Sequence, residues 1–98
     1  MELDEIKALV DKSILNLKNE LNVEIEGEIN EDSNLFDILD SMDVVNLIME
    51  TESLLEQELG FYIPLANEVT FDAEKSPLKS YKQWLHFIFD LIKDSHES

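Results

Sequence analysis

The sequence contains no cysteine, only two glycines and only two prolines. Without cysteine, disulfide bonds and thiolate metal sites are excluded, and the chain has no nucleophilic thiol of its own. The scarcity of glycine and proline favours a helical fold over a sheet fold, which would need many turns. An absence of cysteine also fits a reducing compartment, so we expect the protein to be cytoplasmic.

Long apolar runs are missing as well. No stretch approaches the roughly 20 apolar residues that a membrane-spanning helix requires. Residues 1–5 carry no basic flank and no apolar run of the kind found in signal peptides. We therefore expect neither a membrane span nor a secretion signal.

Basic residues are few: 7 are basic and 23 are acidic, which gives a formal net charge of −16 at pH 7. Such a charge repels the phosphates of nucleic acid, so we expect no nucleic-acid partner. It would attract a basic patch on a partner protein. Self-repulsion lowers stability but keeps a small protein soluble, and we expect a monomer.

Metal-binding and catalytic patterns are also absent. His86 and His96 are too few and too far apart for a convincing metal site. Residues 32–34 are similar to the start of a calcium-binding loop, but the glycine and the distant glutamate of that loop are out of place. Ser41 has no histidine near it in the sequence that would suggest a hydrolase triad. We therefore expect no metal and no catalytic residue.

What the sequence does contain is apolar residues at helical spacing. Hydrophobic residues make up 44% of the chain, enough for one modest core. Spacings of three and four predict a first helix over residues 2–21 and a second that starts at Asp40 or Ser41 and runs to about Leu59. Both starting residues are good N-caps, and Gly60 is a plausible stop.

The remainder of the chain predicts two more helices. A short helical turn is expected over residues 65–69, and a last long helix starts at Ser80, which has capping-box spacing with Gln83. One domain is expected over residues 1–98, with a polar tail that frays over residues 94–98. The predicted fold is all-α: a small four-helix bundle of three long helices and one short, with a long loop between the first two.

That long loop, residues 22–39, leads directly to a serine. We expect Ser41 to stand exposed at the start of the second helix, near the first free backbone N–H groups. Helix N-termini favour anions, so a phosphodiester on Ser41 would be tolerated despite its acidic neighbours. The alternative interpretation is that Ser41 is an ordinary N-cap.

The residues Asp40-Ser41-Met42 resemble the Asp-Ser-Leu triplet with which the acyl carrier protein family opens its second helix. The resemblance continues through residues 44–50 to Ile63-Pro64 and covers nearly the whole chain. It implies that Ser41 carries a 4'-phosphopantetheine arm, donated from coenzyme A by a phosphopantetheinyl transferase. It also implies that the thiol of the arm holds acyl groups as thioesters, and that the protein itself is not an enzyme.

Two segments differ from the carriers of fatty acid synthesis. The second helix is about one turn longer, near residues 52–58, and residues 71–78 form a longer connection. Both features resemble specialised stand-alone carriers, including D-alanyl carriers with a similar Phe-Asp element. We therefore expect an acyl carrier of a specialised pathway. An aminoacyl carrier of the D-alanyl or peptidyl type is one alternative, and an acidic helical adaptor that never bears an arm is another.

The acidic face of the second helix is the expected docking surface for partner enzymes. These partners would be the transferase and acyl- or aminoacyl-activating and acyl-transferring enzymes with basic patches. Asp40 and Met42 flank the serine, and the remaining candidates are Asp43, Asn46, Met49, Glu50, Glu52 and Glu56. The family often has an acid where this chain has Asn46. The alternative interpretation is an ordinary solvated helix face.

A further set of apolar residues is expected to line an interior that opens for an acyl chain: Val45, Ile48, Leu59, Phe61, Ile63 and Trp84. The plainer interpretation is that these residues form the core. An opening cavity would sacrifice part of the packing, so we expect any acyl pocket to be small or transient.

Overall fold

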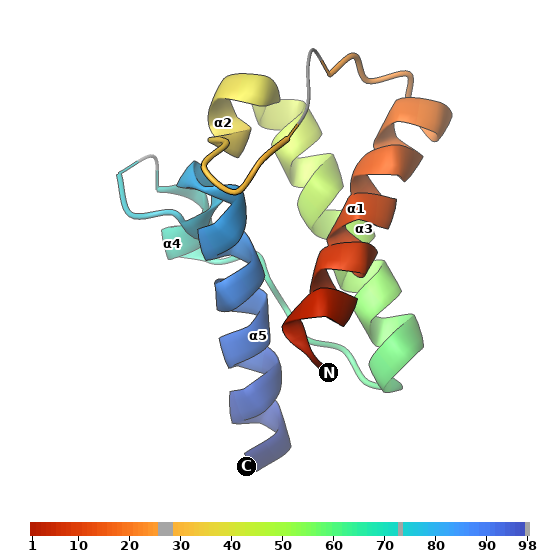
Figure 1. Ribbon diagram of the computed structural model, residues 1–98, viewed down its shortest axis with the longest axis vertical. Helices are drawn as coiled ribbons and strands as arrows, with labels where there is room; N and C mark the ends of the chain where they lie inside the picture. Colours follow the sequence, from red (N-terminus) through yellow and green to blue (C-terminus); the bar gives the residue numbers. More distant parts are fainter. Residues whose placement is uncertain (26–28, 73, 98) are drawn as a thin grey trace.

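The computed structural model describes residues 1–25, 29–72 and 74–97. Residues 26–28 of the predicted loop, residue 73 of the longer connection and residue 98 of the predicted tail lie outside it, as do the side chains of His96 and Glu97. Over the described residues every regular element is helical: α1 (Leu3–Glu20), α2 (Leu35–Ile38), α3 (Ser41–Leu59), α4 (Glu68–Phe71), a 3-10 helix η1 (Pro77–Lys79) and α5 (Tyr81–Glu97) (Figure 1).

The first helix confirms the apolar pattern of the sequence. Its N-terminus is closed by a capping box, in which Glu5 Oε1 accepts a hydrogen bond from Glu2 N at 3.1 Å. Leu21 is exposed just beyond the last turn, although the apolar spacing places it on the inner face. The buried apolar face consists of Ile6, Leu9, Val10, Ile14 and Leu17.

The second long helix, α3, begins and ends where the sequence predicts. Asp40 is its N-cap, and Asp40 Oδ1 accepts a hydrogen bond from Asp43 N at 2.8 Å. At the other end Gly60 has a φ of 80°, the left-handed conformation that a residue with a Cβ rarely adopts. The buried apolar face consists of Val44, Leu47, Ile48, Leu54 and Leu55.

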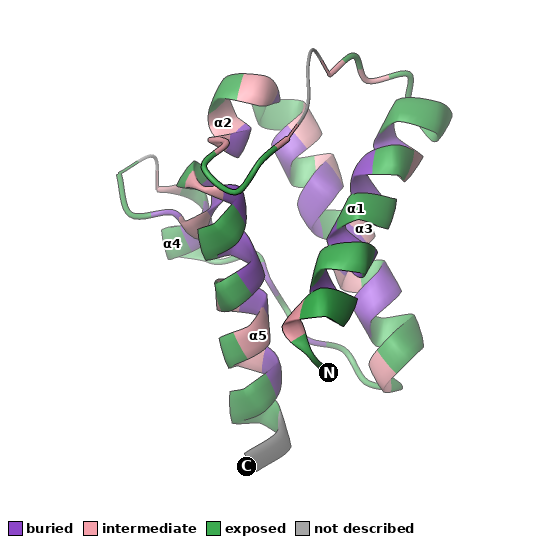
Figure 2. Ribbon diagram, viewed as in Figure 1, coloured by how far each residue is buried: buried purple, intermediate pink, exposed green. Residues whose placement is uncertain are grey.

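The three long helices enclose one core. α1 runs antiparallel to α3 and α5 and packs against both of them (Figure 1). Their inner faces are buried and their outer faces exposed, as Figure 2 shows. The largest fully buried side chains come from all the long helices and from the segments between them: Trp84, Ile6, Leu17, Leu35, Leu47, Ile48, Leu55, Leu65, Leu78 and Ile88.

The short elements differ from the expected four-helix arrangement. α2 lies inside the segment expected to be loop, α4 begins three residues later than expected, and η1 precedes α5. Each short element has a side-chain cap that is local in the sequence. Asn34 Oδ1 accepts from Phe36 N, Asn67 Oδ1 from Thr70 N, and Ser76 Oγ from Leu78 N. These caps start helices that are too short to show an apolar period.

The long connection is fastened to the first turn of α5. Tyr81 N donates to Ser33 O at 2.8 Å, and Lys82 N donates to Glu31 O at 3.0 Å. Ser80 Oγ donates to the same Glu31 carbonyl at 2.9 Å, and accepts from Gln83 N at 3.4 Å. These bonds fix residues 31–33, just before α2, against the start of α5.

Two further observations concern the C-terminal region and the helix lengths. The backbone is helical through Glu97, although the sequence predicts fraying from residue 94. Of the helices in the described ranges, none is both long and apolar enough to cross a membrane.

Candidate functional site

Ser41 is the first residue of α3, and its side chain is exposed. The buried side chains of Leu35 and Leu39 anchor α2 on the core immediately before it, and Leu39 N donates to Leu35 O at 2.9 Å. The chain therefore leaves the core at Leu39 and re-enters it at Val44. The intervening residues carry the serine hydroxyl at the surface.

The cap of α3 is made by Asp40 and not by Ser41. Asp40 accepts from Asp43 N through its side chain and from Val44 N through its carbonyl oxygen. Within the described ranges, Ser41 Oγ makes no hydrogen bond that would hold it. The alternative that Ser41 serves as an ordinary N-cap is therefore wrong, and its hydroxyl is free for chemistry.

The backbone around Ser41 keeps open donors. The first N–H groups of a helix have no intrahelical acceptor. Asp40 occupies those of Asp43 and Val44, which leaves the N–H groups of Ser41 and Met42 to solvent or to a ligand. An oxyanion on Ser41 would lie beside these donors and the positive end of the helix dipole.

Two carboxyl groups give this junction a negative character. Burial of the Asp43 carboxyl group, and then the charge of Asp40 and a hydrogen bond with it, raise the pKa of Asp43 above its ordinary value. A nearby cation would offset the repulsion between the two negatively charged carboxylates. A lysine or arginine of a partner would therefore be favoured here.

Behind Ser41, one face of α3 exposes large apolar side chains. Met42 is 68% exposed, Val45 36% and Met49 61%, and their spacings of three and four residues place them on one face. Glu56, also exposed, lies two turns further along the same face. We call this set, Met42, Val45, Met49 and Glu56, the α3 stripe.

Three other predicted docking residues are less accessible. Asn46, Glu50 and Glu52 are half-buried. Glu50 Oε1 accepts from Asn16 Nδ2 of α1 at 2.8 Å, and Glu52 Oε2 accepts from Leu65 N at 2.6 Å. Both glutamates therefore hold the fold together, whatever they contribute to docking.

The six predicted lining residues do not surround one enclosed space. Ile48, Ile63 and Trp84 are buried, Leu59 is half-buried, and Val45 and Phe61 are exposed. On α3 the inward position is taken by Val44, which is buried, and Val45 beside it is 36% exposed. The expectation for Val45 is therefore wrong. Phe61 follows the Gly60 turn and is 44% exposed, so it does not line the interior either.

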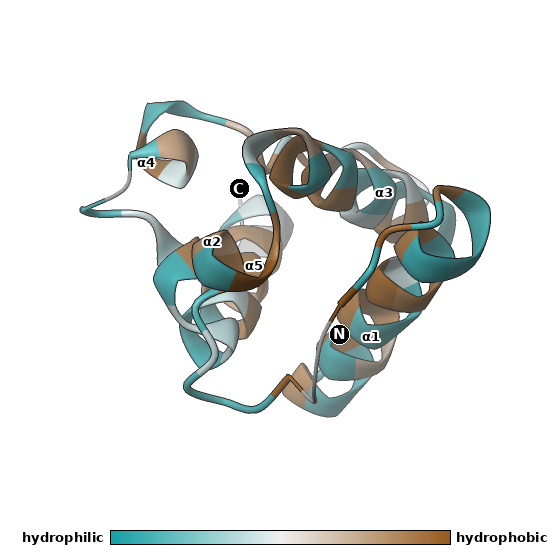
Figure 3. Ribbon diagram, turned by 90° about the horizontal axis from the view of Figure 1, so that it is seen from above, coloured by the Kyte–Doolittle hydropathy of each residue, from teal (hydrophilic) through white to brown (hydrophobic). Residues whose placement is uncertain are grey.

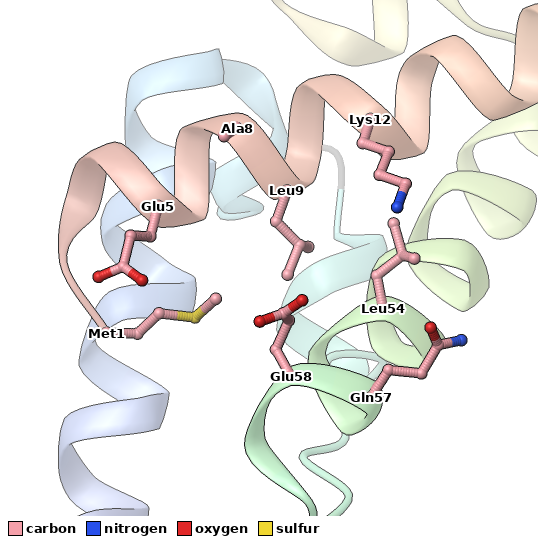
Figure 4. A pocket seen from close by; sticks show the side chains of 8 residues that line it. All are labelled: Met1, Glu5, Ala8, Leu9, Lys12, Leu54, Gln57 and Glu58. Carbon is pink, nitrogen blue, oxygen red and sulfur yellow. The ribbon is translucent and has the colours of Figure 1, made fainter.

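Two hollows lie at the opposite end of α3 from Ser41. One, of about 280 Å³, lies between the start of α1 and the end of α3 and is bordered by Met1, Leu9, Leu54 and Glu58 (Figure 4). Its neighbour, of about 440 Å³, includes Leu59 and Phe61. At a rise of 1.5 Å per residue, Leu59 is about 27 Å along the helix from Ser41. These hollows are therefore separate from the serine.

The sequence interpretation missed two exposed apolar residues of α4, Val69 and Phe71. Their helix has only four residues, too few for an apolar stripe to be recognised. It follows the chain segment that Glu52 ties to α3 through Leu65 N. In the described part of the chain, no three histidine, aspartate or glutamate side chains gather as a metal site.

Comparison with known proteins gave no relative. No protein-family model matches this chain, and no curated protein and no solved structure matches it. No residue role is therefore transferred from a homologue. What Ser41 can do has to be judged from its own surroundings.

Proposed function

We propose that this protein is a carrier whose Ser41 bears a 4'-phosphopantetheine arm. The observation that carries the proposal is the exposed hydroxyl of Ser41, which is not used by the fold because Asp40 caps the helix. An exposed serine at a helix start that plays no structural part is available to a modifying enzyme. The resemblance around Asp40-Ser41-Met42 supports the same assignment.

The residues around Ser41 fit the arm. The open N–H groups of Ser41 and Met42 can donate hydrogen bonds to the phosphate, and the helix dipole favours its charge. Met42 supplies an apolar surface next to the attachment point. The arm would supply the thiol that this chain lacks and would hold acyl groups as thioesters. The protein would present those groups to enzymes and catalyse nothing itself.

Partner enzymes would dock on the α3 stripe. Its apolar residues can enter a shallow partner surface, and Asp40, Asp43 and Glu56 can pair with basic side chains at the rim. The net charge of −16 would draw such a partner from a distance. The transferase and acyl-activating and acyl-transferring enzymes are the partners that this chemistry suits.

The test is incubation with coenzyme A, Mg²⁺ and a promiscuous phosphopantetheinyl transferase. Intact mass should rise by one phosphopantetheine in the wild-type protein and in Ser53→Ala, an exposed serine of the same helix. The rise should be lost in Ser41→Ala. An unchanged mass for the wild type, or a rise that persists in Ser41→Ala, would contradict the proposal.

The alternatives separate in the same preparation. Loading of the modified protein by an acyl-activating enzyme supports the specialised acyl carrier, and loading by an aminoacyl-activating enzyme supports the D-alanyl or peptidyl type. If no arm is attached, the exposed α3 stripe favours the acidic adaptor.

A further inference from the structure

Trp84 has a buried hydrogen-bond donor without an acceptor. Its side chain is fully buried, and Nε1 has no hydrogen-bond partner among the residues that the structure describes. The indole nitrogen can only donate, so nothing else about the group compensates for its lost hydration. Nearly all buried donors in folded proteins have an acceptor, so an unpaired one is unusual.

The surroundings of the indole offer it packing but no acceptor. The ring of Phe87 stacks on it with the ring centroids 5.6 Å apart. The buried core cluster that contains Trp84 is otherwise aliphatic except for Tyr81, whose hydroxyl donates to Asp11. A phenylalanine would fill this place without an unpaired donor. The tryptophan therefore suggests an acceptor that comes from outside the chain.

Trp84 lies at the same end of the bundle as Ser41. It belongs to the first turn of α5, which is bonded to the loop through Ser33 and Glu31. α2 follows that loop directly and leads through Leu39 to the serine. Figures 1 and 3 show α2 beside the start of α5, and η1 packs against both. A group tethered to Ser41 thus starts from the end of the bundle that also holds Trp84.

We propose that the indole N–H of Trp84 is the hydrogen-bond donor for an oxygen of the cargo carried on Ser41. The cargo class is then an acyl chain with a carbonyl or hydroxyl oxygen along its length, in preference to a plain alkyl chain. The apolar part of such a chain would replace apolar contacts of the core beside the indole, while its oxygen would meet the N–H. The inference rests on the proposed carrier function and adds the chemistry of what is carried.

The experiment uses the full chain, labelled with ¹⁵N, in which Trp84 gives the only indole N–H signal. The protein is modified with two arms of equal length, one ending in a β-keto acyl chain and one in the corresponding alkyl chain. Mass spectrometry first shows that both arms are attached to Ser41. If neither attaches, the carrier proposal fails and this inference is lost with it.

With both arms attached, the β-keto chain should shift the indole proton downfield. It should also slow exchange of that proton with solvent by about tenfold relative to the alkyl chain, the ratio that one net hydrogen bond provides. Equal shifts and equal exchange for the two chains would overturn the inference while leaving the carrier function intact. An indole proton that is already shifted downfield without cargo, and that neither chain shifts further, would show a permanent internal partner and would also overturn the inference.

A variant gives a second readout. Trp84→Phe keeps an aromatic ring and removes the donor, so the β-keto and alkyl forms should then melt at the same temperature. In the wild type the β-keto form should melt higher. Phe89→Leu is the matched control, since it changes another partly buried ring of α5, beside the hollow that is remote from Ser41, and keeps the N–H; it should preserve the difference. If Trp84→Phe does not fold, the wild-type exchange measurement still decides.

Discussion

At the scale of single residues, the division of labour between Asp40 and Ser41 is the main finding. Neighbouring residues at a helix start usually compete for the cap, because both aspartate and serine are good N-caps. Here Asp40 takes the cap and Ser41 lies one position inside the helix with its hydroxyl in solvent. The fold therefore depends on the aspartate for its cap and does not use the serine hydroxyl.

This division predicts different costs for two adjacent substitutions. Asp40→Ala should lower the free energy of unfolding by about 1 kcal/mol, because it removes the hydrogen bond to Asp43 N. Ser41→Ala should change it by less than about 0.5 kcal/mol, as expected for an exposed side chain without a structural role. Urea denaturation measures both. A larger cost for Ser41→Ala than for Asp40→Ala would assign the cap to the serine.

A second residue-scale prediction concerns Tyr81. Burial, and then the hydrogen bond that its hydroxyl donates to Asp11 and the charge of Asp11, raise the pKa of Tyr81. Above about pH 10 the unfolded chain releases this proton while the folded protein retains it. The free energy of unfolding should therefore be unaffected by this group below that pH. Above it, stability should fall by at most about 1.4 kcal/mol per pH unit.

The measurement is denaturant unfolding at a series of alkaline pH values for the wild type and Tyr81→Phe. The phenylalanine variant should be less stable near neutral pH, since Asp11 loses a donor, and its stability should decline less steeply above pH 10. Parallel curves for the two proteins would show that Tyr81 does not contribute to the alkaline loss.

At the scale of elements, α3 has two faces of different character. Its inner face packs in the core, and its outer face carries the α3 stripe. Glu52 lies between the faces and accepts hydrogen bonds from Leu65 N and Ala66 N, which hold the segment that leads to α4. The acidic residues of α3 therefore differ in role, because Glu52 bonds to the backbone of another segment while Glu56 is exposed.

Two glutamates of α3 should respond differently to truncation. Glu52→Ala should cost roughly 1.5–3 kcal/mol of stability, because backbone donors lose a charged acceptor. Glu56→Ala, on the exposed stripe, should stay within about 0.5 kcal/mol of the wild type. Chemical denaturation of both variants checks this. Equal effects would mean that the bonds of Glu52 to the backbone are not formed in solution.

Charge reversal on the stripe should affect docking instead of stability. Glu56→Lys should lower the kcat/KM of the transferase for this protein by up to about tenfold at low salt, and less at high salt. Asp90→Lys on α5 makes the same change in net charge on another exposed residue and is the control. An equal loss in the two variants would indicate a response to net charge alone and would remove Glu56 from the docking surface.

The elements also show what the sequence can predict. The long helices follow from apolar spacing, and the ends of α3 follow from Asp40 and Gly60, because these signals are local. Whether Val44 or Val45 faces the core depends on how α3 is rotated about its axis relative to α1. The spacing of apolar residues does not determine that rotation. The partners of Glu50 and Glu52 lie 34 and 13 residues away in the sequence, so no local pattern reveals them. The short helices α2 and η1 could have been predicted from their N-cap residues, Asn34 and Ser76.

At the scale of the whole molecule, charge is the dominant feature. The net charge of −16 is held in a body with a radius of gyration of 12.7 Å. The described residues contain one ion pair that offsets it, between Lys7 and Asp11, which are 2.8 Å apart. The Debye length is about 10 Å at 0.1 M salt, so most of the acidic groups repel one another under ordinary conditions.

Salt should therefore stabilise the protein. At 1 M NaCl the Debye length falls to about 3 Å, and much of the repulsion is removed. A gain of about 1 kcal/mol would raise Tm by roughly 4–8 °C in a domain of this size. Calorimetry at low and high NaCl measures the change. A Tm that is constant or falls with NaCl would show that the acidic groups do not destabilise the fold.

At this scale too, the loop bonded to α5, the anchored α2 and the Asp40 cap together place the Ser41 hydroxyl at the surface. The most direct measurement is fragmentation of the protein after reaction with coenzyme A and the transferase, which identifies the residue that bears the added mass. We expect the phosphopantetheine on the peptide that contains Asp40-Ser41-Met42, and on the serine itself. Attachment at any other residue, or none under conditions that modify a known carrier, would contradict the role proposed for Ser41.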